Sequence, residues 1–188
     1  METRDRRGRL RSGVTAAGLL ALAVPWTASA TPHVLDVGDS HTWLAGTYPP
    51  AWEVYAEPSR NSTQGLSILR SRLRDRHDEV VFDLGTNDRD RIGSFRANIE
   101  AVWRKIGTRR DLTLVTSYVP HDPGSAKPVN AVLGRFAARH PRRVVLVQLD
   151  DAARAHPEWD GGDGIHLNAA GYEARKSMLR SAVRAGRF

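Results

Sequence analysis

Five short apolar runs, separated by segments with helical periodicity, constrain what this chain can fold into. The runs cover residues 33–38, 52–58, 79–85, 112–120 and 143–150. Apolar residues recur at helical spacing in 65–76, 95–107, 128–140 and 168–185. Strands that alternate with helices form βαβ units, and continuous apolar strands are typical of a sheet covered on both faces. We therefore predict an α/β fold, a flavodoxin-like doubly wound five-stranded parallel sheet in three α/β/α layers.

The first thirty residues have the layout of a secretory signal peptide. An arginine-rich start precedes an apolar stretch from Val14 to Trp26, and Ala28-Ser29-Ala30 then forms an A-x-A cleavage site. The apolar stretch is shorter than the ~20 residues that cross a bilayer; a retained membrane anchor is the alternative. We predict that residues 1–30 are a signal peptide, that residues 31–188 form one mature domain, and that the domain is secreted or held in the cell envelope.

Composition narrows the classes of partner. The chain has no cysteine, so disulfides do not stabilise it. Its net charge is +7, but the basic residues after position 30 are scattered and not interleaved with aromatic residues, which argues against a nucleic-acid interface. The histidines outside the last loop show no metal-ligand spacing. We expect a monomer without metal or cofactor, and without a transmembrane domain after processing.

Polar residues cluster where three of the predicted strands end. Gly38-Asp39-Ser40 follows the first strand and Gly85-Thr86-Asn87-Asp88 follows the third. A loop after the fifth strand contains Asp163-Gly164-Ile165-His166. Each cluster alone is equally typical of an ordinary turn. In a doubly wound sheet, however, ligands bind beyond the carboxyl ends of the strands, at the crevice between strands 1 and 3. We therefore expect the three clusters to meet there.

The side chains in these clusters have complementary chemistry. A serine hydroxyl such as that of Ser40 is a weak nucleophile until a base takes its proton, and His166 is suited to that role. Asp163 can hold the imidazole in the required tautomer. Asn87 and the backbone N–H of Ser40, at a helix start, can donate hydrogen bonds to a developing oxyanion. The pattern predicts a serine hydrolase with Ser40, His166 and Asp163 as its catalytic residues.

The order of the three blocks resembles that of the SGNH, or GDSL-type, hydrolases across nearly all of residues 31–188. The chain is also similar in style to the catalytic domains of peptidoglycan O-acetyltransferases. The resemblance implies an SGNH hydrolase fold, with Ser40 as nucleophile, Asn87 as an oxyanion-hole donor, and Asp163 and His166 as the rest of the triad. The α/β-hydrolase elbow G-x-S-x-G is absent, because Thr42 stands where its second glycine would be.

One block departs from the family pattern. The resemblance implies a glycine after the second strand whose backbone N–H joins the oxyanion hole. Ser59 occupies that place in "EPSRNSTQGL", and its backbone N–H is the candidate third donor. Gly65 is interpreted as a glycine at the start of the following helix.

The sequence as a whole predicts an exported serine esterase that hydrolyses small, acetyl-type esters through an acyl-enzyme. Two alternatives stay open: an O-acyltransferase acting on cell-wall glycan, and a catalytically silent glycan-binding domain. The expected substrate is a small ester or an acylated glycan. Trp43, Tyr48 and Trp159 are candidates to line its site, whereas Trp52 is expected in the core. Asp39 is expected to brace the nucleophile turn.

Overall fold

The computed structural model describes residues 31–185, and these contain a five-stranded parallel sheet. Its strands are β1 (Val34–Gly38), β2 (Trp52–Ala56), β3 (Glu79–Asp83), β4 (Asp111–Val115) and β5 (Val144–Val147). They pair in the order β2-β1-β3-β4-β5, every pair parallel. This is the flavodoxin-like order, so the predicted fold class is confirmed. The predicted signal peptide lies outside the described residues.

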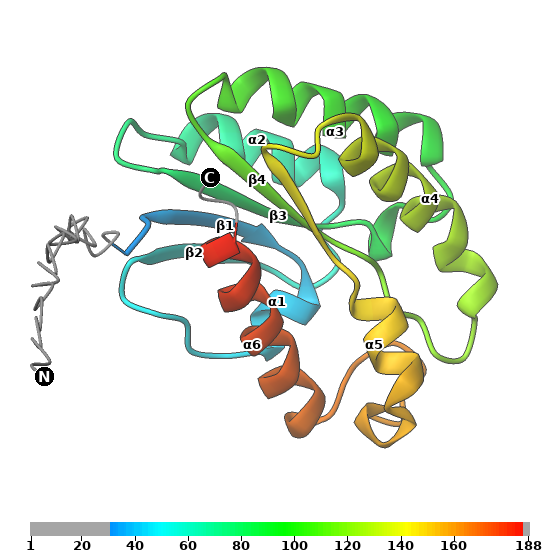
Figure 1. Ribbon diagram of the computed structural model, residues 1–188. Helices are drawn as coiled ribbons and strands as arrows, with labels where there is room; N and C mark the ends of the chain where they lie inside the picture. The colour runs from blue at the N-terminus through cyan, green and yellow to red at the C-terminus, as the bar shows by residue number, and fades with distance from the viewer. Residues whose placement is uncertain (1–30, 186–188) are drawn as a thin grey trace, which may run out of the picture. The chain divides into compact units, whose positions relative to one another are not determined.

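Helices cover both faces of the sheet (Figure 1). One face carries α2 (Ser62–Arg72), α3 (Ile92–Ile106) and α4 (Pro123–Arg139). The other carries α1 (Ser40–Leu44), α5 (Leu149–Ala155) and α6 (Ala169–Ala185). Because successive side chains of a strand point to opposite faces, Phe82 packs in the first core and its neighbour Val81 in the second. Two short 3₁₀ turns, η1 (Thr86–Asp88) and η2 (Pro157–Trp159), complete the elements.

The start of α2 corrects the interpretation of Gly65. Asn61 caps the helix, because its side chain accepts hydrogen bonds from the backbone of Thr63 and Gln64, and the Gln64 side chain accepts one from the Asn61 backbone N–H. Gly65 therefore lies inside α2, and its interpretation as a helix-start residue is wrong. A Cβ at Gly65 would come 2.1 Å from the Leu84 side chain, so close packing against the end of β3 explains the glycine.

Other boundaries also differ from the sequence prediction; the run 112–120, for example, was expected to be one strand, but β4 ends at Val115. The run 143–150 was expected to be one strand, but β5 ends at Val147 and α5 begins at Leu149. The helix expected over 128–140 begins earlier, at Pro123, because the Asp122 side chain caps it and proline fits a first helical turn. A continuous apolar run does not show where a buried strand ends and a buried helix begins. For that reason, α5 was not predicted from the sequence.

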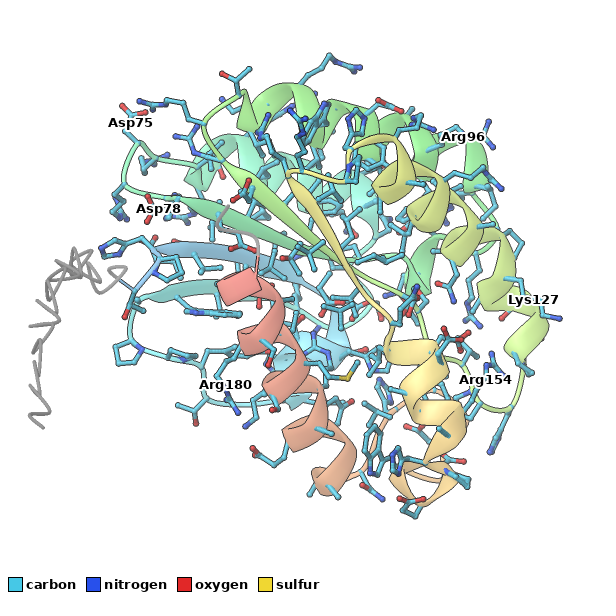
Figure 2. All side chains as sticks on the ribbon, viewed as in Figure 1. Asp75, Asp78, Arg96, Lys127, Arg154 and Arg180 are labelled. Carbon is cyan, nitrogen blue, oxygen red and sulfur yellow. The ribbon has the colours of Figure 1, made fainter. Side chains whose placement is uncertain are left out.

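Charged side chains are spread around the domain. Figure 2 shows labelled basic side chains on four different helices, Arg96 on α3, Lys127 on α4, Arg154 on α5 and Arg180 on α6. Within residues 31–185, no helix combines the length and apolar character needed to cross a bilayer.

Candidate active site

The nucleophile turn sits where β1 meets β3. Gly38 and Asp83, the last residues of these strands, are paired in register. A Cβ at Gly38 would come 1.9 Å from the Thr42 hydroxyl, so only glycine allows this tight turn into α1. Asp39 caps α1 by accepting a hydrogen bond of 2.9 Å from the His41 backbone, which is the bracing role expected for it. Ser40 is thereby the first residue of the helix.

Ser40, His166 and Asp163 form a continuous chain of hydrogen bonds. His166 Nε2 lies 2.9 Å from the Ser40 Oγ, and His166 Nδ1 lies 2.6 Å from the Asp163 Oδ2. With its proton on Nδ1, the imidazole donates to Asp163 and accepts from the Ser40 hydroxyl. The structure thus brings the three side chains together in the geometry that nucleophilic catalysis requires.

The loop before α6 holds Asp163 in place. Its Oδ1 accepts hydrogen bonds from the backbone of Ile165 at 3.0 Å and of His166 at 2.8 Å. Together with the His166 ring, these donors hold the pKa of the Asp163 carboxyl below its usual range. The carboxylate therefore stays ionised while it orients the imidazole. Gly164 turns the chain with φ at +83°, a conformation that glycine adopts without strain.

Asn87 reaches the same crevice from the end of β3. It lies in η1, after Gly85, whose φ is +145°. Its Nδ2 donates to the Arg60 carbonyl at 3.1 Å and to the Asp39 Oδ2 at 3.3 Å. The Ser40 amide lies in the first turn of α1, where backbone N–H groups have no partner within the helix.

Ser59 adopts the backbone conformation of a glycine. Its φ is +61°, and among residues 31–185 no other non-glycine residue has a positive φ. This conformation costs a residue with a Cβ about 1–2 kcal/mol. Such strain is characteristic of functional sites. Ser59 therefore keeps the glycine-like backbone at the position where the family resemblance implies a glycine.

Arg60 fixes the loop that carries Ser59, and no sequence pattern indicated it. Its side chain is 8% exposed. Its Nη1 donates to the Gly38 carbonyl at 3.0 Å and also contacts the Tyr55 carbonyl. These are carbonyls at the ends of β1 and β2, so the arginine ties the Ser59 loop to the nucleophile turn.

A groove of about 600 Å³ opens beside these donors. Every residue that lines it is polar: Ser59, Asn61, Thr86, Asn87, Arg89, Asp90, Arg91, Asp122 and Ser125. The Arg89 guanidinium is fixed by hydrogen bonds to the Thr86 carbonyl at 2.8 Å and to the Ser125 hydroxyl at 2.9 Å. The groove thus offers many hydrogen-bond donors and acceptors, and no hydrophobic side chain lines it to hold a long acyl chain.

A buried polar layer lies beneath the nucleophile. Asp36, at the centre of β1, is fully buried, and neither of its carboxylate oxygens has a hydrogen-bond partner. Burial raises the pKa of Asp36 to about 7 and that of Asp39 to about 6. The His41 ring lies buried beside the His166 ring, with 5.3 Å between centroids, and burial lowers its pKa to about 3.

The aromatic candidates divide between core and surface. Trp52 is 9% exposed and stacks on Tyr48 with 5.6 Å between ring centroids, which confirms the expectation that Trp52 packs in the core. Trp43, on α1, is 57% exposed. Among residues 31–185, no group of three or more histidine and acidic side chains is arranged to hold a metal ion.

The fold and the placement of the three blocks are those of the SGNH hydrolase family. The model of the GDSL-like Lipase/Acylhydrolase family matches residues 37–174, and the chain belongs to that family. The family resemblance read from the sequence is confirmed. No match is found among curated proteins.

Solved structures share the fold at low sequence identity. The C-terminal catalytic domain of Streptococcus pneumoniae peptidoglycan O-acetyltransferase A matches with a TM-score of 0.72 and 18% identity, over 84% of this chain and 95% of that one. A Clostridium thermocellum family 3 carbohydrate esterase matches with a TM-score of 0.63 and 18% identity, over 82% and 98%. An acetyl xylan esterase from Geobacillus stearothermophilus matches with a TM-score of 0.58 and 14% identity, over 82% and 94%.

Proposed function

We propose that this protein is an exported serine esterase that cleaves esters of small acyl groups. The observation that carries the proposal is the unbroken hydrogen-bond chain from Ser40 through His166 to Asp163. In the reaction, His166 takes the Ser40 proton as Oγ attacks the ester carbonyl. It then returns a proton to the leaving alcohol, which leaves an acyl-enzyme. Water, activated by the same base, releases the acid and frees Ser40.

Three donors can stabilise the tetrahedral intermediate. The Ser40 amide and the Asn87 side chain lie at the ends of β1 and β3, and the Ser59 amide lies on the loop after β2. Donors arranged before the reaction cost little reorganisation when charge develops on the oxygen, and each is worth roughly 10²–10³ in kcat. The glycine-like φ of Ser59 supports its inclusion.

The polar groove supports a hydroxylated alcohol as the rest of the substrate. Its lining combines arginine and aspartate side chains, so an anionic headgroup would meet carboxylates as well as guanidinium groups. Sugar hydroxyls both donate and accept, and they suit such a lining. The carbohydrate esterase and acetyl xylan esterase among the structural neighbours support an O-acetylated glycan.

A glycan O-acetyltransferase is the second candidate. The similarity to the peptidoglycan O-acetyltransferase catalytic domain favours it. The two activities share the acyl-enzyme and differ in whether water or a glycan hydroxyl attacks it. A catalytically silent glycan-binding domain fits less well, because such a domain has no need of an aligned serine, histidine and aspartate.

One assay separates these candidates. Purified protein is incubated with 4-nitrophenyl acetate, with and without a chito-oligosaccharide acceptor, and both free acetate and acetylated sugar are measured. An esterase releases acetate in both cases, whereas a transferase forms acetylated sugar when the acceptor is present. Absence of both products, with no labelling of Ser40 by a fluorophosphonate, would contradict the proposed chemistry.

Export is proposed from residues 1–30. N-terminal sequencing of protein recovered outside the cytoplasm should find Thr31 as the first residue. Recovery of the full-length chain in the membrane fraction would favour the retained anchor instead.

A further inference from the structure

Arg175, on α6, is a fully buried arginine whose partners lie on three other segments. Its Nη1 donates to the Tyr48 hydroxyl at 2.8 Å, and its Nη2 donates to the Thr42 hydroxyl at 2.9 Å. The guanidinium also pairs with the Asp83 carboxylate at the end of β3. One side chain thus joins α6 to α1, to the loop after α1, and to the sheet.

Thr42 connects this arginine to the nucleophile. It stands two residues after Ser40 in the short helix α1. Its hydroxyl donates to the Asp83 Oδ2 at 2.7 Å while it accepts from Arg175. Its side chain also packs directly on Gly38, the residue that ends β1. The position of α1 relative to the sheet therefore depends on the bonds that Thr42 makes.

Arg175 is also connected to the loop before α6, which carries the catalytic base candidate His166. Asn168, two residues after His166, accepts a hydrogen bond of 3.1 Å from the Gly171 backbone, in the first turn of α6. The Asn168 backbone donates to the Trp159 carbonyl at 2.8 Å. The base loop is thus anchored to α6, and Arg175 links that helix to the helix that begins with Ser40.

Stability alone does not explain a charge at this place. Burying an ion carries a large desolvation penalty, and well-packed apolar replacements of buried ion pairs are often neutral or stabilising. Helix α6 already packs on the sheet through apolar residues such as Leu179 and Val183. The hydrogen-bond directions of a guanidinium supply something apolar contacts lack, a defined orientation between the two helices.

We propose that Arg175 is a positioning residue for the nucleophile. Acting through Thr42, it holds α1 so that the Ser40 Oγ stays within hydrogen-bond reach of His166 Nε2. The proposal rests on the proposed function of Ser40 and His166. Since a displacement of about 1 Å can lower a rate about 100-fold, a small shift of α1 should show mainly in kcat.

The test compares two buried arginines. Arg175→Met should lower kcat for 4-nitrophenyl acetate about 10- to 100-fold and change KM less than about twofold. Arg175→Lys keeps the charge but cannot bridge the same partners, and it should give an intermediate loss. Arg110→Met is the matched control, because Arg110 is 9% exposed and bonds to backbone carbonyls near the amino ends of the strands. It should lower the melting temperature and leave kcat unchanged.

Thr42→Val tests the route of the effect. If Arg175 acts through Thr42, the double variant should lose little more kcat than the worse single variant, because coupled residues are not additive. Losses that multiply independently would contradict this route. If Arg175→Met fails to fold, Thr42→Val and Arg175→Lys still test the proposal. A kcat within twofold of wild type in both of these variants would overturn it.

A structural readout separates this inference from the proposed function. A crystal structure of the Arg175→Lys variant should show the distance from Ser40 Oγ to His166 Nε2 lengthened beyond hydrogen-bond range. A distance unchanged from 2.9 Å would overturn the positioning role even in a protein that turned over no ester. A wild-type protein with neither turnover nor fluorophosphonate labelling would instead remove the proposed function, and the distance would still decide the positioning role.

Discussion

Arg110 and Arg175 are both buried arginines, one near the amino ends of the strands and the other near the carboxyl ends. The three nitrogens of the Arg110 guanidinium donate to the carbonyls of His77, Ile106 and Arg74 at 3.0–3.1 Å. Arg175 bonds to side chains instead, and its Nε has no hydrogen-bond partner. Arg110 mainly satisfies backbone carbonyls and also contacts the exposed Asp75 carboxylate at 3.4 Å, whereas Arg175 joins side chains beside the nucleophile turn.

The difference extends beyond the two arginines. The oxygens of Asp36, at the centre of β1, and the ring nitrogens of His41, beside the nucleophile, are buried without hydrogen-bond partners; near the amino ends of the strands, His77 Nε2 is also without one. Each such group costs about 1–3 kcal/mol. Unsatisfied polar groups and backbone strain are expected where a fold serves chemistry. Most of these unpartnered groups, together with the strained Ser59, therefore lie in the half of the domain that carries the nucleophile turn.

The largest expected effect comes from removing the nucleophile. Ser40→Ala should abolish ester turnover, with a loss on the order of 10⁶ in kcat, because the members of a triad act as a unit. The melting temperature should change little, since the Ser40 hydroxyl bonds only to His166 among the described residues. Ser71→Ala, an exposed serine on α2, is the matched control and should keep full activity. Turnover in Ser40→Ala near the wild-type level would contradict the serine mechanism.

Asn87→Ala should have the next largest effect. Loss of one oxyanion donor should lower kcat by about 10²–10³ and change KM less, because the bond strengthens mainly in the transition state. Asn98→Ala is the matched control: the Asn98 Nδ2 donates to the hydroxyls of Ser62 and Thr63, away from the nucleophile. A change confined to KM would assign Asn87 to ground-state binding.

The fold and the main candidates for the site could be predicted because they depend on local patterns. Apolar runs with helical segments between them led to the correct sheet, and Ser40, Asn87 and His166 stood in recognisable blocks. Arg60 and Arg175 could not be predicted in the same way. Their partners are 22 and 133 residues away in the chain, at Gly38 and Thr42. A buried arginine has the same sequence signature as an exposed one.

The cost of burying Asp36 without a hydrogen-bond partner should appear as a pH dependence of stability. Burial raises its pKa to about 7 from the usual 3.8, so between about pH 4 and pH 7 the folded state holds a proton that the unfolded state releases. Stability should therefore fall as pH rises through this window, by about 4 kcal/mol for a shift of this size. Asp36→Asn removes the titrating group with little change of shape, and its stability should lose this slope.

Urea unfolding of wild type and Asp36→Asn at pH 4.5, 6 and 8 checks this expectation. The variant should gain stability relative to wild type as the pH rises, by a few kcal/mol over the whole range. Curves that stay parallel from pH 4.5 to pH 8 would show that the folded protein accommodates the Asp36 charge.

The smallest expected effect concerns the strained residue of the site. Ser59→Gly should relieve about 1 kcal/mol of strain at a φ of +61°. The greater freedom of glycine in the unfolded chain offsets a similar amount. The melting temperature should therefore change little, and kcat should stay near wild type because the backbone N–H remains.

Ser59→Ala separates the two ways in which this residue can act. Alanine keeps the N–H and the strain but loses the hydroxyl, so kcat within about twofold of wild type is expected if the amide is the oxyanion donor. A drop of 100-fold would assign the donor role to the hydroxyl instead. Proline is unsuitable as a probe here, because its ring fixes φ near −65° and would rebuild the loop. Equal kcat in the serine, alanine and glycine proteins, with Asn87→Ala impaired, would fit a third donor supplied by the backbone alone.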